Sequence, residues 1–232
     1  MKTIGLIGGM SWESTVPYYR HINETVKQRL GGLHSAKVIL FSVDFHDIER
    51  LQVAGQWDEA GVILGDAARA LERAGAQVLV LCTNTMHKVA PAIEAATTIP
   101  LLHIADPTAD AIKEAGWHTV GLLGTRFTME QAFYRERLER DRKLKVLVPE
   151  ATDRDTVHRI IYDELVLGVV SARSRDAFRA VIARLVAKGA QAVILGCTEI
   201  SLLIGDQDAA VPLFDTTAIH ARAAAEWALT AL

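Results

Sequence analysis

The sequence predicts an α/β fold made of two pseudo-symmetric, doubly wound units, each with a parallel sheet. Three observations lead to this prediction. Short apolar runs alternate with longer amphipathic segments, half of the 232 residues are hydrophobic, and three blocks of sequence recur in the same order. Alternating strands and helices are typical of parallel sheets, because each parallel crossover needs an element about as long as a helix.

Eight short apolar runs mark the expected strands, and amphipathic segments between them mark helices. The strands are Thr3–Ile7, Ala36–Ser42, Gln77–Leu81, Pro100–His103, Thr119–Leu123, Lys145–Leu147, Gln191–Leu195 and Pro212–Phe214. The helices are Trp12–Arg29, Asp58–Arg73, Pro107–Ala115, Met129–Arg142, Asp155–Leu167, Ser174–Ala187 and a final helix after Phe214. Gly75, Gly116 and Gly189 stand where three of these helices should stop.

The two halves of the chain share three collinear blocks, which indicates a duplicated unit. Ile4–Gly8 matches Val120–Gly124, Gly75–Leu81 matches Gly189–Leu195, and Pro100–Leu102 matches Pro212–Phe214. We predict a first domain formed by residues 1–102 plus 215–232 and a second formed by residues 103–214. The final helix would then return to the first domain.

The composition excludes several classes of protein. A formal net charge of −3 gives no basic surface for nucleic acid or an anionic membrane. No apolar run approaches the roughly 18 residues of a membrane span, and the N-terminal run is too short for a signal peptide. Cys82 and Cys197 are 115 positions apart and are expected to stay reduced. We therefore expect a cytoplasmic protein with no nucleic-acid or membrane partner.

Polar residues follow the predicted strands at the point where each strand ends. They are Gly8–Ser11 and Thr83–Thr85 in the first half, and Gly124–Thr128 and Cys197–Glu199 in the second. Open parallel sheets bind ligands outside the carboxyl ends of their strands. We therefore expect these segments to line an active site in the cleft between the two domains.

Alignment of the repeats sets Cys197 opposite Thr83, while Cys82 stands one residue earlier. Cys82 should then point to the other face of its strand and behave as a small buried hydrophobe. Inverting a carbon centre by proton transfer needs one group on each face, which a duplicated fold can supply. A cysteine suits this role because its ordinary pKa of about 8.5 falls at a helix N-terminus. We expect such a helix to begin near Thr198, although a buried structural cysteine is the alternative at both positions.

Four motifs carry a resemblance to a known family: IGLIGGMSWEST at 4–15, CTNTMH at 82–87, LLGTRFT at 122–128 and GCTEI at 196–200. With them, the chain resembles the cofactor-independent aspartate/glutamate racemases over nearly its whole length. Members of that family carry Cys-Asn-Thr in the first half and Gly-Cys-Thr-Glu in the second, and the two cysteines flank the substrate α-carbon. Here Thr83 takes the place of the first cysteine. This Thr/Cys pair resembles the atypical L-aspartate/glutamate-specific racemases.

The resemblance implies an amino acid racemase (an isomerase) for L-aspartate or L-glutamate that uses neither pyridoxal phosphate nor another cofactor. Cys197 would remove the α-proton of the L-amino acid, and Thr83, or a water it holds, would return a proton on the opposite face. A hydroxyl is a far weaker acid than a thiol, so the L-to-D direction should be faster. The reverse cannot be abolished, because the two enantiomers have equal free energy.

The resemblance also implies a homodimer and a substrate shell. The shell residues are Met10, Gln52, Asn84, Thr85, Thr125 and Thr198. The hydroxyl and amide side chains among them are suited to an α-carboxylate, but they often only cap a helix. Arg126 and Arg50 are the nearest cations in sequence for a second carboxylate, although Arg50 also fits a solvated surface position. His87 could assist a thiol or an anion, or simply pack.

Three alternatives stay open at this point. The first is a broad-specificity racemase, acting for example on homoserine, and the second is a related hydantoin racemase or maleate isomerase. The third is a binding module in which GLIGGM cradles a nucleotide phosphate, but its glycine spacing does not match the dinucleotide fingerprint. No grouping of His, Cys and Asp has the spacing of metal ligands, so no metal is expected.

Overall fold

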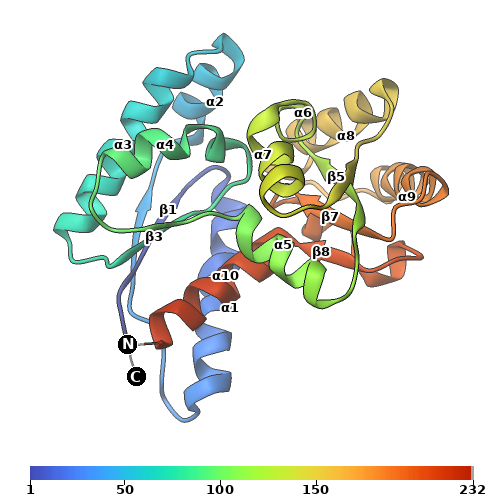
Figure 1. The fold of residues 1–232 in the computed structure, drawn as a ribbon. Helices are drawn as coiled ribbons and strands as arrows, with labels where there is room; N and C mark the ends of the chain where they lie inside the picture. The colour runs from blue at the N-terminus through green and yellow to red at the C-terminus, as the bar shows by residue number, and fades with distance from the viewer. Residues whose placement is uncertain (231–232) are drawn as a thin grey trace. The chain divides into compact units, whose positions relative to one another are not determined.

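The computed structural model describes residues 1–230, which contain eight strands arranged in two four-stranded sheets (Figure 1). The chain divides into two compact units. Unit 1 comprises Met1–Ile104 and the C-terminal segment from His220 onward, and unit 2 comprises Ala105–Ile219. The α/β class is confirmed, and the assignment of residues 1–102 plus 215–232 and 103–214 to two domains stays a prediction.

Unit 1 contains a parallel sheet in the order β2-β1-β3-β4. Its strands are β1 (Ile4–Gly8), β2 (Val38–Ser42), β3 (Val78–Leu81) and β4 (Leu101–Leu102). Its helices are α1 (Trp12–Leu30), α2 (Phe45–Ala54), α3 (Trp57–Arg73), the 3₁₀ helix η1 (Thr85–Val89), α4 (Ala90–Ala95) and the part of α10 (Thr216–Leu229) from His220.

Helices cover both faces of this sheet, because successive strand side chains point to opposite sides. Ile7, Leu79 and Leu81 are buried with apolar residues of α3. Ile4, Leu6, Val78 and Val80 are buried with α1 and α10. Figure 1 shows α3 and α4 on one side of β1 and β3, and α1 and α10 on the other. The predicted doubly wound arrangement is therefore confirmed in unit 1.

Unit 2 contains a second parallel sheet in the order β6-β5-β7-β8, which repeats the strand order of unit 1. Its strands are β5 (Thr119–Gly124), β6 (Lys145–Leu147), β7 (Ala192–Gly196) and β8 (Leu213–Asp215). Its α-helices are α5 (Ala105–Glu114), α6 (Arg126–Glu130), α7 (Ala132–Glu136), α8 (Ala151–Asp163) and α9 (Ala172–Ala187), besides the start of α10. The shared topology confirms that the chain contains two like units.

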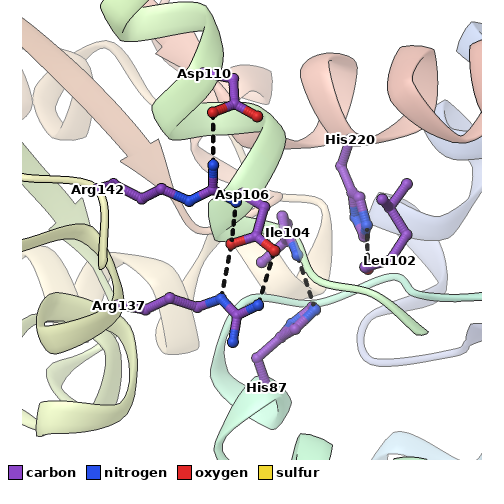
Figure 2. Close-up of polar contacts among 8 residues, drawn as sticks. All are labelled: His87, Leu102, Ile104, Asp106, Asp110, Arg137, Arg142 and His220. Carbon is purple, nitrogen blue, oxygen red and sulfur yellow. Dashed lines mark hydrogen bonds and ion pairs between the residues drawn. The ribbon is translucent and has the colours of Figure 1, made fainter. Parts of the chain in front are cut away.

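The core of unit 2 lies between its sheet and α8 and α9. An ion cluster joins α5 to the π-helical turn η2 (Arg137–Asp141) and to Arg142 just beyond it (Figure 2). Arg137 donates to both carboxylate oxygens of Asp106 at 2.8 and 2.7 Å, and Arg142 lies 3.1 Å from the same carboxylate. Burial acts to raise the pKa of Asp106, but the two guanidinium groups outweigh it and lower the pKa.

The register of the two sheets matches the alignment of the internal repeat. Ile7 pairs with Leu81 in unit 1, and Leu123 pairs with Leu195 in unit 2. Thr83 and Cys197 each stand two residues beyond those leucines. The two positions are therefore equivalent in their respective units.

The residue before each of these positions differs for a steric reason. A Cβ added to Gly196 would lie 2.8 Å from the carbonyl oxygen of Leu123, closer than real Cβ atoms approach. Glycine is therefore needed where β7 runs past β5. The equivalent place in unit 1 holds Cys82, whose side chain enters the core between the sheet and helices α1 and α10.

Three sequence-based expectations about helices were wrong or incomplete. The predicted helix Met129–Arg142 is divided into α6, α7 and η2, because Gln131 adopts extended backbone with φ −85° and ψ 149°. The helix expected near Thr198 is only a 3₁₀ turn, η4 (Ile200–Leu202). The elements α2, η1 and α4 were not expected, although Asp44 caps α2 by accepting a hydrogen bond from the His46 amide.

Candidate active site

The carboxyl ends of β1 and β3 hold one set of the predicted site residues. Met10 lies two residues after β1, and Thr83, Asn84 and Thr85 follow β3 directly. Because β1 and β3 are neighbouring parallel strands, both segments emerge at the same edge of the sheet of unit 1. All four residues are buried.

Gln52 joins this set from α2, the helix that the sequence pattern did not reveal. Its side-chain Nε2 donates to Sδ of Met86 at 2.9 Å, and Met86 lies in η1, directly beyond Thr85. Gln52 is buried, and Met86, to which it donates, belongs to an apolar cluster that also contains Met10. The shell residues predicted in the first half are therefore gathered in unit 1.

The carboxyl ends of β5 and β7 hold the second set. Thr125 follows β5, and Cys197 and Thr198 follow β7, a neighbouring parallel strand. All three residues are buried. The Oγ1 atom of Thr125 accepts a hydrogen bond from the Thr128 amide at 3.3 Å, so this threonine does cap α6. The capping role that we weighed against substrate binding is present at this position.

A buried carboxylate lies against Cys197. The Cys197 thiol donates to Oε2 of Glu199 at 2.9 Å, and the Thr198 hydroxyl donates to the same oxygen at 3.0 Å. Glu199 is only 2% exposed. Our sequence analysis placed Glu199 in a segment expected to line the active site but gave it no role in proton transfer, although an acidic residue two positions after a candidate nucleophile was a usable signal.

The protonation of Cys197 differs from the expectation. Burial and the negative charge of Glu199 raise the pKa of this thiol well above its ordinary value. The backbone amides of Thr198 and Glu199 act in the opposite direction but do not outweigh these effects. A three-residue 3₁₀ turn supplies little of the dipole that we expected from a helix. Cys197 is therefore held as a thiol beside a proton acceptor.

Cys82 lies apart from this chemistry. Its side chain is fully buried among apolar residues of β1, β3, α1 and α10, and burial alone raises its pKa. Its Sγ atom approaches the Val80 carbonyl oxygen at 3.8 Å. This is the environment of a structural cysteine.

The two arginines considered for a second carboxylate lie at the surface. The Arg126 side chain is about half exposed (49%) and pairs with Asp155 at 2.8 Å, and Arg50 is exposed. Within residues 1–230, no cluster of three or more His, Cys, Asp or Glu side chains is placed to hold a metal ion. Nor is any helix in that part of the chain long and apolar enough to cross a membrane.

Comparison with known proteins gives a consistent picture. A model of the Asp/Glu/hydantoin racemase family matches residues 7–224. The crystal structure of a Yersinia pestis protein, described as a candidate Asp/Glu racemase, is similar with a TM-score of 0.92 and 63% identity, covering 99% of this chain and 100% of that one. The structure of an aspartate racemase homologue from Pyrococcus horikoshii OT3 has a TM-score of 0.84 and 35% identity, covering 98% and 99%.

A more distant relative is the broad specificity amino-acid racemase RacX of Bacillus subtilis (strain 168). It is 21% identical over 231 residues, which cover 94% of this chain and 95% of RacX.

A thiol hydrogen-bonded to a carboxylate at the carboxyl edge of a parallel sheet forms a site suited to proton transfer. The family model matches residues 7–224, which is nearly the whole chain. The chain therefore belongs to the Asp/Glu/hydantoin racemase family. It is therefore a racemase, an isomerase that inverts a carbon centre.

Replacing Glu199 should change the titration of Cys197. In a Cys82→Ala background, which leaves one thiol, Glu199→Gln is expected to lower the pKa of Cys197. The substitution removes the negative charge that favours the protonated thiol. The thiolate is followed by its ultraviolet absorbance as pH is raised.

Cys197→Ser in the same background is the control and should abolish the signal. A titration midpoint that stays in place or moves to higher pH in the Glu199→Gln variant would show that Glu199 does not govern the thiol.

Proposed function

We propose that this racemase acts on L-aspartate or L-glutamate without pyridoxal phosphate or another cofactor, through Cys197 on one face of the α-carbon and Thr83 on the other. The observation that carries the proposal is the register of the two sheets, which gives Thr83 and Cys197 equivalent positions in two like units. A two-base inversion needs one proton-transferring group from each side of the substrate.

Glu199 supplies what Cys197 needs to act as a base. The thiol already donates to its carboxylate at 2.9 Å, so proton transfer to Glu199 creates the thiolate without a further rearrangement. The thiolate then takes the α-proton of the L-amino acid and leaves a carbanion. The backbone amides of Thr198 and Glu199 stabilise the Cys197 thiolate during this step.

Thr83 acts as the proton donor on the opposite face. Its hydroxyl, or a water bound to it, gives a proton to the carbanion, and solvent restores that proton while Glu199 releases its own. A hydroxyl is a poor base, so the D-amino acid is deprotonated slowly. Because the equilibrium constant is one, kcat/KM is equal in the two directions. The asymmetry therefore appears in kcat and KM separately, with the larger kcat for the L form.

Buried residues that follow the strands, together with Gln52 of α2, form the proposed substrate shell. Met10, Gln52, Asn84 and Thr85 belong to unit 1, and Thr125 and Thr198 to unit 2. Uncharged hydroxyl and amide groups suit the α-carboxylate and α-ammonium groups that amino acids share. Solved relatives described as Asp/Glu and aspartate racemases support an acidic side chain on the substrate.

The second candidate is a racemase of broad specificity, acting also on homoserine. Two observations favour it over a strictly acidic specificity. RacX matches nearly the whole chain, and both arginines considered for a second carboxylate lie at the surface. The family also contains hydantoin racemases, which makes hydantoins a further substrate class to test.

The first test is exchange of the α-proton in deuterium oxide, followed by NMR without added cofactor. Separate samples contain the L and D forms of aspartate, glutamate and homoserine. We expect exchange and inversion with L-aspartate or L-glutamate, and at least a thousandfold loss in Cys197→Ser, because a serine hydroxyl is a much weaker acid than a thiol. Silence on all six amino acids would contradict the proposed substrate class.

The second test restores a thiol at the other position. Thr83→Cys is expected to raise the saturating D-to-L rate by about tenfold or more, since a thiol ionises more readily than a hydroxyl. The rate is followed by polarimetry from each pure enantiomer. Cys82→Ala is the matched control, because Cys82 is buried in the core and should leave both rates unchanged. An unaltered D-to-L rate in Thr83→Cys would remove Thr83 from the mechanism.

We further propose that the enzyme works in the cytoplasm as a homodimer, with an apolar face of unit 1 as the contact between two copies. Trp12, Val16 and Tyr19 lie on one side of α1 and are each at least half exposed. Together with Leu40 of the edge strand β2 they line a hollow of about 250 Å³. Exposed aromatic residues beside an open sheet edge favour association with another chain.

A charge on this face should prevent dimer formation. Tyr19→Asp is expected to give a monomer in analytical ultracentrifugation at micromolar concentration, because it buries an unpaired carboxylate in the contact. Val62→Asp is the control, since Val62 is similarly exposed on α3, which covers the opposite face of the sheet. A wild-type monomer, or a dimer that survives Tyr19→Asp, would contradict this assignment.

A further inference from the structure

We propose that His87 is a positioning residue for Thr83, holding the backbone that carries the proton-donating hydroxyl. The inference rests on the proposed function, because it assigns to His87 a part in the proton return to the substrate. His87 itself is buried in unit 1 and is given no contact with the reacting atoms.

Two hydrogen bonds fix both nitrogens of the His87 ring. Nδ1 lies 2.7 Å from the carbonyl oxygen of Thr83, and the backbone N–H of Ile104 donates to Nε2 at 3.1 Å. A carbonyl can only accept and an amide N–H can only donate. Both bonds are therefore made together only by the neutral ring that carries its proton on Nδ1. Figure 2 shows His87 reaching from η1 to Ile104, in the segment that follows β4.

The segment on the far side of His87 is itself anchored. Nε2 of His220, in α10, lies 2.8 Å from the Leu102 carbonyl oxygen (Figure 2). Its Nδ1 lies 3.0 Å from the Tyr18 hydroxyl. The His103 ring packs against that of His87, with the two ring centroids 4.4 Å apart. All three histidines are buried. Residues 102–104 thus form a fixed support for the His87 ring.

The consequence is that Thr83 is held at both of its backbone polar groups. Its N–H donates to the Leu81 carbonyl at 2.9 Å, and its C=O accepts from His87. The chain turns here from β3 into η1, so no sheet partner fixes this residue. His87 supplies that constraint, and it sets where the Thr83 hydroxyl stands. Proton return needs this precision, because a displacement of about 1 Å can cost roughly a hundredfold in rate.

A pair of amide variants separates the two bonds of His87. In His87→Asn the side-chain amide nitrogen takes the place of Nδ1 and can still donate to the Thr83 carbonyl. In His87→Gln the amide oxygen takes the place of Nε2 and can accept from Ile104, but the donor toward Thr83 is lost. We expect Asn to retain the function of Thr83 and Gln to lose it.

The readout is the ratio of two products formed from an L-amino acid in deuterium oxide. The carbanion receives its deuteron either from the Cys197 side, which gives deuterated L-amino acid, or from the Thr83 side, which gives the D form. NMR with a chiral derivatising agent measures both products in one sample. Misplacement of Thr83 in His87→Gln should raise the ratio of deuterated L to D product by about tenfold or more.

A merely structural role would leave this ratio unchanged, because a smaller folded fraction lowers both products equally. Leu71→Ala is the control: it removes a buried side chain of α3 from the core on the other face of the sheet and takes no part in the histidine contacts. It should lower the melting temperature without moving the ratio. An unchanged ratio in His87→Gln, or equal shifts in the Asn and Gln variants, would overturn the role of His87. Absence of any exchange by the wild-type enzyme would overturn the proposed function, and this inference with it.

Discussion

The parallel pairing of β1 with β3, and of β5 with β7, is the constraint on which the rest of the site depends. Each pairing brings two loops to one sheet edge. Each also fixes the residue at which the strand ends and the predicted site residues begin. A slip of one residue in β7 would turn Cys197 to the opposite face of the strand. Gly196 allows β7 to keep this register beside β5, because a side chain at that position would clash with the Leu123 carbonyl oxygen.

The two units use this constraint differently. In unit 1 the strand end is followed by a threonine whose backbone is held by histidine, whereas unit 2 places a thiol against a carboxylate. In unit 1 the hydrogen bond fixes the backbone position of Thr83. In unit 2 the carboxylate of Glu199 favours the protonated form of Cys197. Two units of the same topology thus carry unlike groups, each with its own local hydrogen bonds. The two sheets share one strand order, and the residues that follow their strands differ.

Much of the fold was readable from the sequence, because strand and helix periodicity and the repeat agree with each other. All eight strands were predicted within a few residues, and the repeat alignment already set Thr83 opposite Cys197. The sequence could not show that Gln131 interrupts a helix, since glutamine is a good helix former and neither glycine nor proline marks the break. It also could not show that Glu199 turns back onto the Cys197 sulfur, because a two-residue separation does not determine side-chain direction. We expected a helix N-terminus to lower the pKa of Cys197, and this expectation was wrong. Burial and the neighbouring Glu199 carboxylate raise the pKa, and the three-residue turn is too short to act as a helix.

The protonated state of Cys197 has a consequence beyond catalysis. Hydrogen peroxide and electrophiles react with thiolates, and a buried thiol that keeps its proton is a poor target for them. In the mechanism proposed above, the Glu199 carboxylate that accepts the proton during turnover also keeps Cys197 protonated between turnovers. Under that proposed mechanism, the thiolate exists mainly while a substrate is being deprotonated, and the resting thiol is a poor target for oxidants.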